Sequence, residues 1–138
     1  MKEVPFSHSE VQKALEKPST AVLATINRDG SPLATPMWFV RDEHGIVMVS
    51  PEGLQKVRNM RRDPRVSVVV ETGAGTGLQC VIVQGSIEFL DDDGERAAFG
   101  ALLVAKYGRD MENRWRGRAV PHDRVLFRIE PRRVKLWG

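Results

Sequence analysis

The sequence predicts a mainly β fold with flanking helices, built as a small closed or split barrel of six antiparallel strands in one domain, residues 1–138. Six segments show strand-like runs or alternation of apolar residues, and short turn sequences bound most of them. Consecutive strands lack the connecting helices that a parallel sheet needs. The predicted strands are residues 21–26, 32–41, 45–50, 66–70, 78–89 and 124–137.

The first part of the chain predicts a short helix followed by a hairpin. Ser7 and Glu10 have the spacing of a capping box, so Ser7 is the expected N-cap of a helix that covers one end of the barrel. Asp29-Gly30 is a strong hairpin signal between the first two strands. Pro36 lacks a backbone donor and predicts an edge or a bulge in the second strand.

A strand, turn, helix and strand are expected between Gly45 and Glu71. The helix is predicted to begin near Glu52 or Gly53, after the turn signal of Ser50-Pro51. The free N–H groups and the positive dipole of a helix N-terminus favour an anion, and Lys56 lies about one turn in. This segment therefore predicts a phosphate-binding site.

The side chains of this helix separate by angle into three groups. The apolar arc consists of Leu54, Val57 and Met60. One flank, the arginine stripe, consists of Arg58, Arg61, Arg62 and Arg65. Lys56 and Asn59 lie on the other flank, which sets Lys56 apart from the stripe. The alternative that all five cations form a solvated helix face stays open on this pattern alone.

The second half of the chain predicts a loop, a long strand, a helix and a closing strand. The glycine-rich residues 72–77 are followed by a strand and not by a helix, which argues against a nucleotide fingerprint. Gly85 is an expected bend. Asp91 to Asp93 suit a helix N-terminus, with no partner for a metal site. The expected packing face of that helix is Ala97, Ala98, Ala101, Leu102 and Ala105.

Composition narrows the class of ligand. The net charge of +3 and the pI near 9.4 are mildly basic, and the cations have few aromatic neighbours, which disfavours nucleic acid and favours an anionic small molecule. There is no apolar run of membrane-spanning length and no secretory leader, so a cytoplasmic location and no membrane partner are expected. Cys80 and the three histidines lack the spacing of a disulfide, a metal site or a catalytic triad.

Ser50 and the string K-x-R-N-x-R-R-D-P-R-V from Lys56 to Val66 resemble the signature of the split-barrel oxidoreductases related to pyridoxamine 5′-phosphate oxidase. The resemblance extends from about Thr20 to Trp137 and is greatest to the small F420-dependent branch. It implies an FMN-binding split-barrel type of fold and a homodimer with cofactor sites at its interface. It also implies hydride transfer from F420 to a small organic substrate, with FMN as the alternative cofactor.

The resemblance also implies roles for individual residues. Lys56, Asn59 and the backbone around Gln55 are expected to bind the cofactor phosphate, and Ser50 to support the ring or ribityl side. Pro36, Met37 and Trp38 are expected to frame the ring and the substrate pocket. Gln79 is expected to contact the cofactor from across the dimer interface, and Trp137 to approach the cofactor site from the end of the closing strand. Relatives often have an arginine two positions before the lysine, where this chain has Leu54. We therefore expect either weaker binding of the phosphate or an arginine that reaches the site from another part of the protein.

The choice of cofactor and the catalytic residues stay open at this point. A tail groove for F420 is expected from Arg109, Arg114, Arg116 and Arg118. FMN needs no such groove. A non-catalytic cofactor carrier or sensor and a haem-handling protein are further alternatives, although His8, His44 and His122 have no clear axial-ligand context. No side chain is identified as a proton donor.

Overall fold

The structure is a computed structural model that describes residues 1–71, 79–108, 110, 111, 115 and 120–137. Its strands are β1 (Lys2–Val4), β2 (Ala21–Ile26), β3 (Pro32–Met37), β4 (Phe39–Asp42), β5 (Gly45–Pro51), β6 (Arg65–Glu71), β7 (Cys80–Phe89) and β8 (Arg124–Trp137). Its helices are α1 (Ser9–Glu16), α2 (Gln55–Arg62) and α3 (Asp93–Tyr107).

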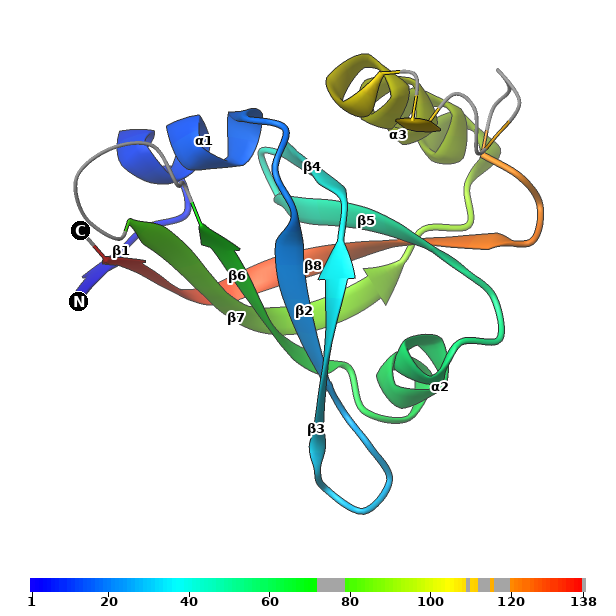
Figure 1. Cartoon of the computed structure of the whole chain (residues 1–138), viewed down its shortest axis with the longest axis horizontal. Coiled ribbons are helices and arrows are strands. Elements are labelled where there is room, and N and C mark those ends of the chain that lie inside the picture. Colours follow the sequence, from blue (N-terminus) through cyan, green and yellow to red (C-terminus); the bar gives the residue numbers. More distant parts are fainter. Residues whose placement is uncertain (72–78, 109, 112–114, 116–119, 138) are drawn as a thin grey trace.

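The strands form one antiparallel sheet that curls into a barrel with a break in it (Figure 1). The strand order is β3-β2-β6-β7-β8-β5-β4, and β1 pairs with β8. This order places β3 and β4 at opposite ends of the path, although only Trp38 separates them in the chain. We call this place, where the chain passes from one edge of the sheet to the other, the split.

The mainly β split barrel is confirmed, with eight strands in the described residues instead of the six predicted. The predicted strand 32–41 is two strands, because the chain leaves the β2 edge after Met37 and pairs with β5 from Phe39 onward. Pro36 lies on an edge strand, as its missing donor requires. The additional strand β1 is three residues long, too short for a clear alternation.

The barrel interior is an apolar core closed at both ends by short helices. Val68, Phe127 and Ile129 are examples of its fully buried strand residues. Helix α1 adds Val11 and Leu15 at one end, and α2 adds residues of its apolar arc at the other. Figure 1 shows these two helices at opposite ends of the curled sheet. The expected role of α1 as a cover is thereby confirmed.

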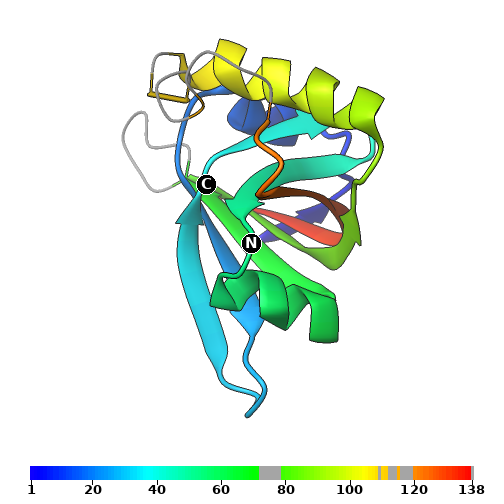
Figure 2. The ribbon, with the colours of Figure 1, turned by 90° about the vertical axis from the view of Figure 1, so that its right-hand side faces the viewer.

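Helix α3 packs on the outside of the barrel over β4 and β5, where a second apolar cluster forms (Figure 2). Its buried residues are Phe99, Gly100 and Leu103. The predicted packing face of α3 was wrong: its alanines and Leu102 are exposed. The larger Phe99 and Leu103 bury more apolar area than alanines do, and they determine which side of the helix faces the sheet.

Local backbone details explain where two helices begin. Helix α2 starts at Gln55, later than predicted, because Gly53 has a φ of +87° and Leu54 is extended. The N-cap of α1 is His8 and not Ser7, since His8 Nδ1 accepts a hydrogen bond of 3.2 Å from the Glu10 N–H. The capping signal was therefore displaced by one residue.

The two glycine-dependent strand features follow the prediction. The hairpin between β2 and β3 turns at Gly30, which has a φ of +88°. Gly85 lies at a shift in the β7–β8 register, and a Cβ there would lie 2.1 Å from the Glu130 carbonyl oxygen. A side chain at this bulge is therefore excluded by the facing backbone.

No helix in these described ranges combines the length and the apolar character needed to cross a bilayer. No group of three or more histidine, cysteine or carboxylate side chains in them is arranged to hold a metal ion.

Candidate cofactor pocket

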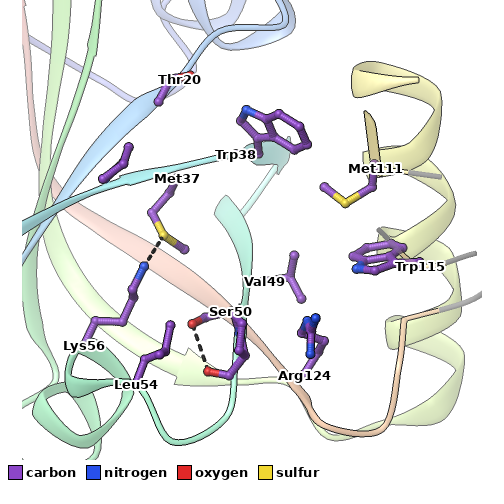
Figure 3. A pocket seen from close by; sticks show the side chains of 12 residues that line it. Thr20, Met37, Trp38, Val49, Ser50, Leu54, Lys56, Met111, Trp115 and Arg124 are labelled. Atoms are coloured by element: carbon purple, nitrogen blue, oxygen red, sulfur yellow. Dashed lines mark hydrogen bonds between the residues drawn. The ribbon is translucent and has the colours of Figure 1, made fainter. Parts of the chain in front are cut away.

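A pocket of about 560 Å³ lies beside the split, between the ends of β3 and β5, the start of α2 and the region that follows α3 (Figure 3). Its lining residues are Thr20, Pro36, Met37, Trp38, Val49, Ser50, Pro51, Leu54, Lys56, Met111, Trp115 and Arg124. Five of the nine predicted site residues are therefore together: Pro36, Met37, Trp38, Ser50 and Lys56.

The Lys56 ammonium group points into this pocket from the first turn of α2 (Figure 3). Its hydrogen-bond partner is the Met37 Sδ atom at 3.0 Å, a weak acceptor for a full charge. Burial lowers the pKa of Lys56 below its usual value of 10.5. Among the lining residues of the described chain there is no carboxylate. The pocket thus holds a half-buried cation that an anionic ligand would stabilise.

The arginine stripe points elsewhere and is held by local contacts. Arg58 donates to the Gly53 carbonyl and to Gln55, and Arg62 donates to the Ile26 carbonyl. Arg61 pairs with Glu52 at 3.1 Å and Arg65 with Asp63 at 2.7 Å. The separation of Lys56 from these arginines, predicted from helical angles, is confirmed.

Asn59 and Gln55 lie outside the pocket lining. Asn59 is fully buried, and its amide donates to Thr25 Oγ1 at 3.0 Å and to Asn27 Oδ1 at 2.8 Å. Gln55 Nε2 in turn donates to Asn59 Oδ1 at 2.8 Å. These bonds tie α2 to the β2–β3 hairpin, which gives Asn59 a structural role; its predicted phosphate contact stays a prediction.

The start of α2 is arranged for a polar ligand. Its N-cap, Leu54, provides no side-chain hydrogen bond, so the first N–H groups of the helix have no side-chain cap. Ser50 is buried at the end of β5 beside this turn, and its hydroxyl donates to the Pro51 carbonyl at 3.1 Å. Lys56, the helix dipole and Ser50 therefore meet at one corner of the pocket.

A second cation, Arg124, was not predicted as a site residue. It opens β8 opposite Pro51 in the β5–β8 ladder, which brings it to the pocket from 68 positions further along the chain than Lys56. Its guanidinium pairs with the exposed Asp123 at 2.9 Å. Local pattern could not reveal this placement, because it depends on the pairing of two distant strands.

The wall remote from the start of α2 is aromatic and apolar (Figure 3). Trp38 comes from the split, and Met111 and Trp115 come from the region that follows α3. Met111 and Trp115 are buried in the second apolar cluster and were also not predicted as site residues. The pocket therefore has a cation at one corner and aromatic and apolar side chains opposite it, which suits an anionic ligand that contains a ring.

Gln79 and Trp137 line a different groove, of about 670 Å³, together with residues of α1. In Figure 1 the end of β8 lies at the far side of the barrel from α2. These two predicted residues are therefore not brought to the pocket within one chain. Four predicted cations, Arg109, Arg114, Arg116 and Arg118, lie outside the described residues.

Comparison with known proteins supports this fold. A curated pyridoxine/pyridoxamine 5′-phosphate oxidase from Rubrobacter xylanophilus is 27% identical, over 92% of this chain and 69% of its own. A conserved hypothetical protein from Mycobacterium tuberculosis has a solved structure with a TM-score of 0.81 and 27% identity, covering 99% of this chain and 88% of that one.

Two further solved structures share the fold at lower identity. One is an F420 reductase with a TM-score of 0.67 and 24% identity, covering 96% of this chain and 98% of that one. The other is a haem storage protein from Vibrio cholerae with a TM-score of 0.74 and 20% identity, covering 94% and 92%. A family model described as pyridoxamine 5′-phosphate oxidase matches residues 7–138. With nearly the whole length matched and the split barrel in place, the chain belongs to the pyridoxamine 5′-phosphate oxidase family.

Proposed function

We propose that this protein is an oxidoreductase that binds F420 and transfers a hydride to a small organic substrate. The observation that carries the proposal is the Lys56 ammonium group, which is half-buried in a pocket whose described lining residues include no carboxylate and whose thioether, that of Met37, accepts its hydrogen bond. An anionic group of the ligand would compensate for the hydration that this ammonium group loses on burial. Family membership and the shared fold of an F420 reductase support the redox part.

The residues present fit a phosphorylated ring cofactor. Lys56, Arg124 and the free N–H groups at the start of α2 would hold the phosphate, and Ser50 would stabilise the adjoining polar chain. Trp38 and its neighbours would contact the ring. The cofactor, when bound, supplies the hydride chemistry, so the protein needs to bind, orient and exclude water. No lining side chain is assigned the role of proton donor.

FMN is the second candidate cofactor. F420 continues beyond its phosphate as an anionic tail, and of the cations proposed for that tail none lies within the described residues. Arg124 is a described cation that lines the same pocket and could serve either ligand, and it is our candidate for the arginine that Leu54 replaces. The preference for F420 therefore rests on the sequence resemblance and on Arg109 to Arg118.

We further propose that two copies pair and complete each pocket. An apolar row crosses the outer face of the sheet through directly paired residues, namely Pro36, Val22, Val69 and Ile82. Val22 and Val69 are 42% and 38% exposed, which is unfavourable on a solvated face. Pro36 belongs to both the row and the pocket. A second copy on this face would lie beside the pocket. Gln79 and Trp137, which do not reach the pocket of their own chain, would then be able to contact the pocket of the other copy.

The test is a fluorescence titration of the purified protein with F420 and, in parallel, with FMN, at low and moderate salt. The expected result is preference for F420, with an affinity that weakens with salt as phosphate and tail contacts are screened. Preference for FMN would support the flavin alternative. Binding of neither would refute the proposal and leave the fold assignment intact.

Pairing is tested separately by light scattering. Val69→Lys places a charge in the apolar row and should convert a dimer into a monomer with weaker cofactor binding. Leu102→Lys is the control, since Leu102 is 49% exposed on α3 and lies outside the row. A wild-type monomer that binds F420 tightly would contradict the paired site.

Two non-redox alternatives have distinct outcomes. A carrier or sensor would bind the cofactor but show no substrate-dependent oxidation of its reduced form. A haem-handling protein would show a Soret band on addition of haem. A haem storage protein shares the fold, but none of the three histidines lines the pocket.

A further inference from the structure

The split breaks the hydrogen-bond ladder of the barrel at Trp38. The chain pairs with β2 up to Met37 and with β5 from Phe39 onward. A backbone donor at such a transition needs a partner from outside the sheet. Here the Phe39 N–H donates to the Tyr107 hydroxyl, at 3.1 Å between N and Oη.

Tyr107 belongs to the last turn of α3 and contacts three features around the pocket. Its hydroxyl donates to the Ser19 carbonyl at 2.8 Å, next to the pocket residue Thr20. Its ring stacks on Trp38, with centroids 4.7 Å apart and planes 8° apart. Burial raises the pKa of Tyr107, which keeps the hydroxyl protonated as a donor.

The neighbouring residue strengthens this attachment of α3. Lys106 Nζ donates to the Leu15 carbonyl at 2.6 Å and lies 3.8 Å from the centre of the Phe39 ring. The last turn of α3 thus holds α1, the start of β2 and the start of β4 together. Tyr107 is the member of this turn that also contacts a pocket side chain.

We propose that Tyr107 is a positioning residue for the pocket: its ring sets the plane of Trp38, and its hydroxyl fixes the backbone on both sides of the pocket wall. The stack covers one face of the Trp38 indole while the same indole lines the pocket. A bound ring would therefore meet a wall whose angle α3 determines. The consequence for ligand binding rests on the proposed function; the consequence for Trp38 does not.

The first experiment uses the ligand-free full-length protein. Near-ultraviolet circular dichroism of the wild type minus that of Trp38→Phe isolates the Trp38 signal. Tyr107→Leu should abolish this signal, and Tyr107→Phe, which retains an aromatic ring for the stack, should preserve it. A Trp38 signal that persists in Tyr107→Leu would overturn the proposal whether or not a cofactor binds. A signal lost equally in both variants would overturn the role of the ring and assign the effect to the hydrogen bonds of the hydroxyl.

The second experiment compares F420 with inorganic phosphate as ligands. Tyr107→Leu should weaken F420 binding by about three- to tenfold, the range for an aromatic pair, and leave phosphate binding within about twofold. Equal loss for both ligands, or loss for neither, would contradict positioning of the wall. Leu102→Ala on the exposed side of α3 is the matched control, and thermal unfolding of every variant separates loss of position from loss of fold.

Discussion

Lys106, in the partly buried last turn of α3, predicts a measurable link between pH and stability. Burial, helped by the nearby charge of Arg41, lowers the pKa of Lys106 from 10.5 to about 8. The unfolded chain therefore holds a proton that the folded chain has released between about pH 8 and pH 10.5. Stability rises with pH where the unfolded state binds more protons, so Lys106 should contribute a rise across this window.

The size of that rise follows from the two pKa values. At about 1.36 kcal/mol for each pH unit, the full difference corresponds to at most about 3.4 kcal/mol. Lys106 is only partly buried, and both the Leu15 carbonyl and the face of the Phe39 ring favour its ammonium form. Solvent screening and these contacts reduce the expected rise to about 1–2 kcal/mol.

The assay is urea unfolding of the wild type and of Lys106→Met at several pH values from 7 to about 11. The difference in unfolding free energy between the two proteins removes the titration of other groups. The wild type should gain about 1–2 kcal/mol relative to the variant across the window. Lys13→Met, the same change at an exposed position of α1, is the control for loss of a lysine charge. Parallel curves for wild type and Lys106→Met would refute the reasoning.

Further predictions concern the pocket and the sheet. Lys56→Ala should weaken F420 binding by about tenfold or more, the effect of losing a charge-assisted contact, whereas Arg65→Ala, outside the pocket, should change it by less than about twofold in the same titration. Burial lowers the pKa of Lys56, so the affinity of the wild type for F420 should begin to fall at a lower pH than the one at which an exposed lysine loses its proton. Lys56→Arg should show no such fall. Arg128→Met should cost about 3 kcal/mol in urea unfolding, because it leaves Asp42 without the partner that lies 2.7 Å away; adding Asp42→Asn should recover part of the loss. Gly85→Ala should cost about 1–3 kcal/mol by the same assay, since its Cβ would meet a backbone carbonyl.

The sequence predicted the fold well where local pattern and packing agree. Alternating strands, the hairpin at Gly30 and the bend at Gly85 are all confirmed. Local pattern failed where tertiary packing chooses between similar options. On α3, the alanines and the pair Phe99 and Leu103 both have the spacing of a packing face. Only contact with β4 and β5 determines which of the two sides is buried.

In the site, too, local pattern predicted some features and missed those that depend on tertiary packing. Helical angles correctly separated Lys56 from the arginine stripe, but they also grouped it with Asn59, which is buried against the β2–β3 hairpin. Angles around a helix axis do not say which direction faces a distant strand. Arg124, Met111 and Trp115 reach the pocket through strand pairing and α3 packing, and no local sequence signal marks them.

The position of the pocket follows from the topology of the sheet. Because β3 and β4 lie at opposite ends of the strand order, the hydrogen-bond ladder does not close between them, and the Phe39 N–H finds its partner in Tyr107 of α3. Pro36, which lacks an N–H, is tolerated on this edge. The same edge places Met37 beside Lys56 at the start of α2, and it places Trp38 on the opposite wall of the pocket (Figure 3). A barrel closed by a continuous ladder would fill this space with paired strands, so the split that weakens the sheet also creates the pocket.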